Sequence, residues 1–163
     1  MLRRILIATT AFALLGAPLH AQTGLPVGTS APDARVQTMD GKPAQLARYV
    51  AKGKPTLIEF WATWCGNCKA LEPQMHAAGK KYAGKVAMVG VAVGVNQSAE
   101  LVKRFAAKHA LPLTVLYDVA GDAADKYDVP ATSYIVVLDR TGKVVYTGVG
   151  SEQNVEAAIR KAL

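Results

Sequence analysis

Two cysteines, Cys65 and Cys68, are the only cysteines in this chain of 163 residues. A disulfide between positions so close in sequence adds little stability, because the gain grows with the length of the loop that it closes. The pair is better suited to thiol–disulfide exchange, in which one thiolate attacks a disulfide and a second thiol resolves the mixed product. Zinc sites use the same spacing, but they need four ligands and the sequence has no second cysteine pair.

A soft metal ion is the alternative that this cysteine pair leaves open. Copper or zinc held by Cys65 and Cys68 would need a further ligand such as a histidine, and His76 and His109 have no evident pairing with the motif. We therefore expect exchange chemistry with no cofactor and no resident metal. A metal-binding module remains the second hypothesis.

The elements around the cysteines predict where the two thiols lie. Residues 56–61 (TLIEFW) are β-branched and aromatic, which predicts a central strand buried on both faces. Apolar residues recur at helical spacing over residues 65–82, with Pro73 expected to kink the helix. Cys65 would then begin a helix, whose dipole and free backbone N–H groups stabilise a thiolate. We expect Cys65 to be the exposed nucleophile and Cys68, one turn later, to face the protein body and resolve mixed disulfides.

Glu59 is anomalous because it is a carboxylate inside the apolar stretch 56–61. An isolated buried charge is costly and usually has a raised pKa or a partner. We expect Glu59 to be buried and to transfer a proton to and from Cys68. The alternative is a glutamate on an edge strand that faces water.

The rest of the sequence predicts helices that alternate with strands, followed by a terminal hairpin. Further strands are expected at residues 34–38, 86–95, 113–117, 133–138 and 143–147, helices at 98–110 and 155–163, and helical turns at 46–51 and 122–127. Ser98 is expected to cap its helix, with Leu101, Val102 and Phe105 on the inner face. The pattern indicates an α/β fold, with a mixed central sheet and helices on both faces.

The N-terminus has the pattern of an export signal over residues 1–21. Arg3 and Arg4 precede an apolar run, and Ala21 is a small residue suited to cleavage. An uncleaved membrane anchor is the alternative, although the run is short for a span of about 20 residues. We expect residues 22–163 to form one domain that is periplasmic or otherwise exported, and that contacts a membrane only if the signal is left uncleaved.

The net charge of the chain is +7, but the distribution of its basic residues argues against a nucleic-acid partner. Residues 1–21 hold two of the nineteen basic residues and none of the twelve acidic ones, so the charge of the remaining chain is +5. Its lysines are scattered and do not alternate with aromatic residues, which predicts a solvated surface and no nucleic-acid site. We expect the domain to be a monomer.

The stretch 58–69 (IEFWATWCGNCK) resembles the active-site segment of thioredoxins. The wider chain is similar to the TlpA/ResA-like exported thioredoxins at residues 28–33 and 40–42, in the helix and strand around residues 98–118, and at residues 137–142. This resemblance implies a thioredoxin fold with an N-terminal hairpin extension and a central helix–strand insertion. It also implies exchange with thiols or disulfides of protein partners, as a reductant that is itself served by an upstream redox partner.

The resemblance implies roles for three further positions. Glu59 matches the buried acid that thioredoxins use to move the proton of the inner cysteine. The lysine that thioredoxins place on the next strand corresponds to Gly90, so that charge partner is missing. Glu72 lies one position later than an acid carried by some TlpA/ResA-like proteins, and its other interpretation is a solvent-facing residue.

The main departure from the family concerns the proline that normally faces the disulfide. Counted back from Asp139, its position falls on Ser133, preceded by Thr132, whereas Pro130 lies three residues earlier. We favour Thr132–Ser133 in this place, with Ser133 as the first residue of an unbroken strand that would tolerate proline there. The alternative is that Pro130 holds the role through a local insertion.

The surface that binds partners is expected to include the residues around the cysteines. We assign Trp64, Gly66 and Asn67 to it, together with whichever of Thr132, Ser133 and Pro130 faces the disulfide. Trp61 is expected to belong to the core.

Overall fold

The computed structural model of the protein describes residues 24–50 and 53–163. The expected export signal at residues 1–21 lies outside the described residues and stays a prediction. Among the described helices, none has the length and apolar character needed to cross a bilayer.

The described part of the chain folds into strands, α-helices and one short 3-10 helix. The strands are β1 (Arg35–Thr38), β2 (Pro43–Gln45), β3 (Thr56–Trp61), β4 (Ala87–Val93), β5 (Thr114–Asp118), β6 (Tyr134–Leu138) and β7 (Val144–Gly148). The helices are η1 (Leu46–Arg48), α1 (Gly66–Lys81), α2 (Ala99–Lys108), α3 (Asp122–Lys126) and α4 (Val155–Arg160).

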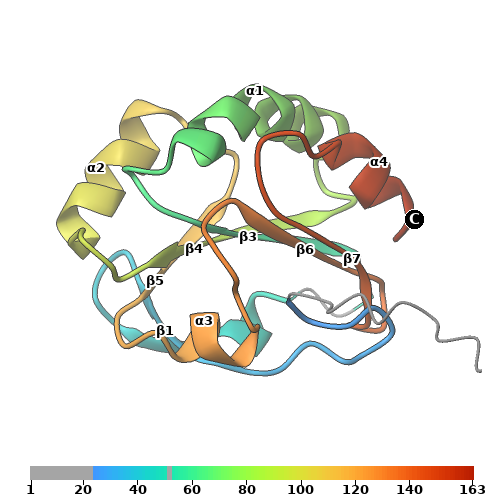
Figure 1. Ribbon diagram of the computed structural model, residues 1–163, viewed down its shortest axis with the longest axis horizontal. Coiled ribbons are helices and arrows are strands. Elements are labelled where there is room, and N and C mark those ends of the chain that lie inside the picture. Colours follow the sequence, from blue (N-terminus) through green and yellow to red (C-terminus); the bar gives the residue numbers. More distant parts are fainter. Residues whose placement is uncertain (1–23, 51–52) are drawn as a thin grey trace, which may run out of the picture.

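One seven-stranded sheet runs in the order β2-β1-β5-β4-β3-β6-β7. Strands β3, β4 and β5 are parallel, whereas β6 pairs antiparallel with β3 and β1 pairs antiparallel with β5. Figure 1 shows α1, α2 and α4 over one face of the sheet and α3 under the other. The expected mixed sheet, N-terminal hairpin and central insertion of α2 and β5 are confirmed. Strand β3 therefore lies inside the sheet, and its C-terminal end leads into α1.

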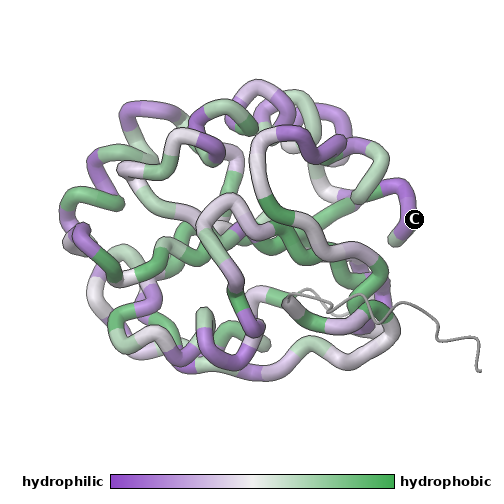
Figure 2. Tube along the Cα trace, viewed as in Figure 1, coloured by the Kyte–Doolittle hydropathy of each residue, from purple (hydrophilic) through white to green (hydrophobic). Residues whose placement is uncertain are grey.

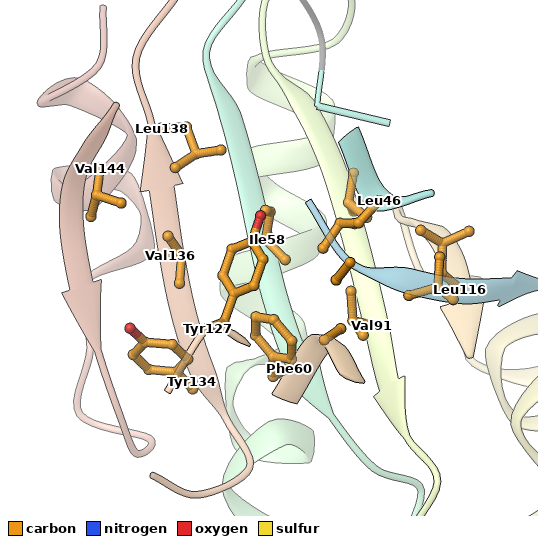
Figure 3. Packing of buried hydrophobic residues seen from close by; sticks show 14 residues of the cluster. Leu46, Ile58, Phe60, Val91, Leu116, Tyr127, Tyr134, Val136, Leu138 and Val144 are labelled. Atoms are coloured by element: carbon orange, nitrogen blue, oxygen red, sulfur yellow. The ribbon is translucent and has the colours of Figure 1, made fainter. Parts of the chain in front are cut away.

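Apolar layers on both faces of the sheet hold β3 in place. On one face, Ile58 and Phe60 pack with Leu46 of η1 and Tyr127 just after α3 (Figure 3). On the other face, Leu57 packs against α1 and α4. The hydropathy colouring of Figure 2 agrees, with apolar strands inside and polar residues on the outer turns of the helices. Every residue of β3 is buried, as expected for a central strand of such composition.

Two local expectations differ from the structure. Ser133 lies just outside β6 rather than beginning it. Leu101 is 39% exposed, so the inner face of α2 consists of Val102 and the half-buried Phe105. Helix α1 continues through Pro73, and the kink expected there stays a prediction. The cap of α2 is confirmed, because the Ser98 side chain accepts a hydrogen bond from the Leu101 N–H at 3.2 Å.

Candidate active site

The cysteine motif occupies the turn between β3 and α1. Cys65 is the N-cap of α1, and the backbone N–H of Cys68 donates to Cys65 Sγ at 3.0 Å. The two sulfurs are joined as a disulfide, with the Cα atoms 5.3 Å apart. A helix start offers its dipole and free N–H groups to a sulfur at this position, so the same contact would stabilise a Cys65 thiolate after reduction.

The exposure of the two cysteines differs from the expectation. Cys65 is 4% exposed and Cys68 is 6% exposed, so the outer cysteine is not open to solvent in the disulfide form. Both residues pack in one cluster with Trp61, Ala62 and residues of β4, α2 and β5. The position of Cys65 at the helix cap, and not its exposure, supports the prediction that it is the nucleophile.

A glutamine that sequence reasoning missed ties the motif to the loop after β4. Gln97 Oε1 accepts from the Thr63 backbone N–H at 2.9 Å, and Gln97 Nε2 donates to the Val93 carbonyl at 2.5 Å. In the same loop, the Val95 carbonyl accepts from Trp64 Nε1 at 2.8 Å. Two hydrogen bonds thus tie Thr63 and Trp64, just before Cys65, to this one loop, while Trp64 stays 48% exposed.

Glu59 lies in the middle of β3 and is 4% exposed. Its register partners are Gly90 on β4 and Ile135 on β6, which rules out an edge strand that faces water. Burial, and secondarily the negative charge of Glu72, raise the pKa of Glu59 from 4.5 to about 8. The carboxyl group is therefore mostly neutral at pH 7 and able to exchange a proton near neutral pH.

A cavity of about 10 Å³ lies beside Glu59. That volume is close to the space that one water molecule needs. Its lining residues are Glu59, Trp61, Ala62, Cys68, Lys69, Glu72, Phe105 and Leu111. Glu59 Oε1 and Trp61 Nε1 are both buried and have no hydrogen-bond partner among the described residues. The cavity thus brings the inner cysteine and the buried acid together.

The absence of a lysine at position 90, where thioredoxins carry one, has a steric explanation. A Cβ atom on Gly90 would lie 2.9 Å from Trp61 Nε1 and 2.9 Å from Leu113 Cδ1. The buried indole of Trp61 therefore occupies the space that a longer side chain at position 90 would need. Glu59 has a glycine, and no cation, opposite it on β4.

Glu72 does not simply face solvent. Its side chain is 21% exposed, lines the cavity, and places Oε2 2.9 Å from His109 Nδ1. Residues four apart share one face of a helix, so the spacing from Cys68 to Glu72 could have predicted this position. His109 comes from the C-terminal end of α2, and no local pattern indicates its contact with α1.

The structure places Thr132 and Ser133 at the same end of the sheet as the motif. Phe60 and Tyr134 are register partners, so the residues after Phe60 and those before Tyr134 lie side by side. The Ser133 N–H donates to the Phe60 carbonyl at 2.9 Å. Thr132 is half-buried and Pro130 is exposed. This placement is compatible with Thr132–Ser133 beside the disulfide, which stays a prediction.

The backbone at Ser133 contradicts the expectation that proline would fit there. Ser133 has a φ of 64°, and its N–H is used in the bond to Phe60. Its hydroxyl accepts from the Gly150 N–H at 3.0 Å, and its carbonyl accepts from Gln153 Nε2 at 2.9 Å. Proline fixes φ near −65° and has no N–H, so it satisfies neither requirement.

The metal hypothesis finds little in the described part of the chain. No group of three or more histidine, cysteine, aspartate or glutamate side chains gathers there in an arrangement that could hold a metal ion. His109 is engaged with Glu72. Within residues 24–50 and 53–163, the cysteine pair is thus not joined by a third side chain of these types.

Comparison with known proteins agrees with the geometry. The family model described as Redoxin matches residues 26–163. The chain belongs to the Redoxin family. It is 33% identical to the thioredoxin-like protein YneN of Bacillus subtilis, over 90% of this chain and 85% of that protein. It is 27% identical to the thiol-disulfide oxidoreductase ResA of the same species, over 90% of this chain and 80% of that protein.

A solved structure supports the fold assignment. The crystal structure of a thiol:disulfide interchange protein of the thioredoxin family from Chlorobium tepidum superposes with a TM-score of 0.68 at 25% identity. The match covers 83% of this chain and 96% of that chain. The expected resemblance to exported thioredoxin-like proteins is confirmed at the level of family and fold.

Replacing Ser133 tests the local backbone of this redoxin. Ser133→Pro is expected to lower the free energy of unfolding by about 3 kcal/mol or more, because it loses the bond to Phe60 and cannot adopt a positive φ. Ser133→Gly, the control, keeps the φ and is expected to lose about 1 kcal/mol with the hydroxyl contact. Urea unfolding measures both. Equal stability of the proline variant and the parent would show that the segment has another conformation.

Burial of Glu59 is expected to make stability depend on pH. The pKa of Glu59 is about 8 in the folded chain against 4.5 for an ordinary glutamate, so the folded state binds more protons between these values. The free energy of unfolding should therefore fall as pH rises from about 4.5 to about 8 and level off above, by several kcal/mol at most.

The control for this effect is Glu59→Gln, which removes the titration and keeps a similar shape. Subtracting the pH profile of the variant from that of the parent cancels all other groups, in urea unfolding of the oxidised protein from pH 5 to pH 9. Parallel profiles would mean that Glu59 is not buried as the structure has it.

Proposed function

We propose that this redoxin is an exported thiol–disulfide oxidoreductase that reduces disulfides of protein partners. Exchange activity follows from the family and from the Cys65–Cys68 pair. The observation that carries the proposal is that Cys65 caps α1 while Cys68 lines a cavity with the buried acid Glu59. The names of two relatives, a thiol-disulfide oxidoreductase and a thioredoxin-like protein, support the same activity.

The first half of the reaction uses the reduced pair. The Cys65 thiolate attacks one sulfur of a partner disulfide, which forms a mixed disulfide and expels the other partner sulfur as a thiolate. The departing thiolate takes up a proton from the medium. The helix start stabilises the attacking anion, because the Cys68 N–H already points at Cys65 Sγ.

The second half uses Cys68 and Glu59. The Glu59 carboxylate accepts the proton of the Cys68 thiol, and the resulting thiolate attacks Cys65 Sγ. The bond from Cys65 to the partner breaks, and Cys65–Cys68 becomes a disulfide. The partner sulfur leaves as a thiolate and takes up the proton that Glu59 accepted from Cys68, so the partner leaves as a dithiol and Glu59 is a carboxylate again. The partner has gained two electrons and two protons. An upstream dithiol protein then reduces the pair again by the reverse exchange.

Partner recognition is proposed for the surface around the motif. Trp64, Gly66 and Asn67 are exposed beside the buried sulfurs, and a Cβ on Gly66 would meet no atom within 4 Å. Thr132 is half-buried at the neighbouring strand end, Ser133 beside it is fully buried with its N–H and carbonyl already bonded, and Pro130 is exposed earlier in the loop. The space over Gly66, next to Cys65 in the chain, is therefore open to a partner chain.

The proposal also includes that the protein is exported, that it is a monomer and that it needs no dissociable cofactor. The pattern of residues 1–21 supports export, and an oxidising compartment is where a reductant for protein disulfides has substrates. No dissociable cofactor enters any step above, because the electrons pass between sulfur atoms alone.

Cysteine variants test the assignment of roles. Cys65→Ser is expected to abolish insulin-disulfide reduction, because attack needs the capping thiolate. Cys68→Ser is expected to accumulate mixed disulfides with insulin, because nothing resolves them. Non-reducing electrophoresis and mass spectrometry detect the adducts. Accumulation by Cys65→Ser instead would reverse the two roles, and full activity of both variants would refute exchange through this pair.

The rate of resolution tests Glu59 as the base. With a preformed mixed disulfide, Glu59→Gln is expected to slow release of the partner by about 100-fold near pH 7. The deficit should shrink above about pH 9, where a thiol ionises without a base. The control is Glu100→Gln, which replaces a glutamate exposed on α2. Stopped-flow release of a labelled peptide gives the rate, and matching pH profiles for parent and Glu59→Gln would make Glu59 structural only.

A further inference from the structure

Glu72 lines the cavity beside the redox pair and contacts His109. Glu72 lines the cavity from α1, and its Oε2 lies 2.9 Å from His109 Nδ1. The His109 ring stacks on Phe105, with the centroids 3.9 Å apart and the planes inclined by 11°. Phe105 in turn packs against Trp61 at 5.7 Å between the ring centroids. A continuous set of contacts therefore holds the imidazole, and through it the carboxylate of Glu72.

This arrangement bears on the charge that Glu59 experiences. Glu59 Oε1 is buried and unpartnered within the described residues. The charged or titratable side chains that line its cavity are Cys68, Lys69 and Glu72 of α1, and His109 reaches it through Glu72. The Lys69 ammonium lies 5.9 Å from the Phe105 ring centroid. An unpaired Glu72 carboxylate would oppose ionisation of Glu59, whereas a cation against Glu72 offsets that repulsion.

We infer that His109 is a positioning residue for the redox site: it holds Glu72 at the cavity, and the charge of this pair sets how readily Glu59 accepts the proton of Cys68. The inference rests on the proposed role of Glu59 as base. It gives the α2 insertion a function, because the end of α2 supplies His109. The charges that influence Glu59 then come from Glu72 and His109, in place of a cation on β4.

The test follows Glu59 itself by its carboxyl ¹³C resonance in a pH titration, assigned with Glu59→Gln. Glu72→Gln is expected to move the titration of Glu59 to lower pH, and His109→Gln to higher pH. Each should change the ionisation constant by about two- to fivefold, the range for partly exposed ion pairs. In His109→Lys, which places a permanent positive charge at this position, Glu59 should titrate at or below the pH of the parent. The control His76→Gln, exposed on α1, should not move it.

The double variant separates direct from indirect action. With Glu72→Gln present, His109→Gln should have little further effect, because His109 acts through Glu72. Melting temperatures confirm that each variant is folded. An unmoved Glu59 titration in folded His109→Gln, or equal effects of His109→Gln with and without Glu72, would overturn the inference.

The same variants distinguish failure of the inference from failure of the proposed function. The pH profile of partner release should shift in the same direction as the Glu59 titration. If the resonance shifts and Glu59→Gln still leaves release unchanged, the base role of Glu59 fails while the coupling of His109 to Glu59 stands. If Glu59→Gln slows release and His109→Gln moves neither readout, the base role stands and the inference fails.

Discussion

The hydrogen bond from the Cys68 backbone N–H to Cys65 Sγ is the contact on which the rest of the site depends. It makes Cys65 the cap of α1, which sets the phase of the whole helix. With that phase, Cys68 turns toward the cavity, and Glu72, one turn later, lies on the same side. A single cap therefore orders the nucleophile, the resolving thiol and the second carboxylate. The buried strand β3 supplies the rigid support, since it delivers both Glu59 and the motif.

Glu59 illustrates how the fold tolerates a destabilising group at a functional position. Its burial opposes ionisation, and neither Oε1 nor the nearby Trp61 Nε1 has a partner within the described residues. The apolar layers on both faces of β3 offset this cost, since each fully buried large apolar side chain contributes roughly 1.5–3 kcal/mol. A local conflict of this kind is expected where catalysis needs a carboxyl group that titrates near neutral pH.

Sequence patterns predicted the strands of the sheet and the redox pair, because the signals for both lie in residues that are close together in the chain. The run TLIEFW matched β3 residue for residue, and Ser98 capped α2 as expected. The errors arose where tertiary contacts decide. Ser133 falls outside β6 because its bonds to Phe60 and to the loop before α4 impose a positive φ. The burial of Cys65 and the contact of Glu72 with His109 depend on where α2 packs, which no periodicity reveals.

The packing of Trp61 explains why the charges that influence Glu59 come from the side of α1 and α2 and not from β4. Its indole nitrogen sits close to Gly90, so β4 has no room for a cation opposite Glu59. The same ring packs against Phe105, which carries the stacked His109. Trp61 thus leaves no room for a cation on β4 opposite Glu59 and, through Phe105, supports His109 at the end of α2. The α2 insertion therefore belongs to the redox chemistry as well as to the fold.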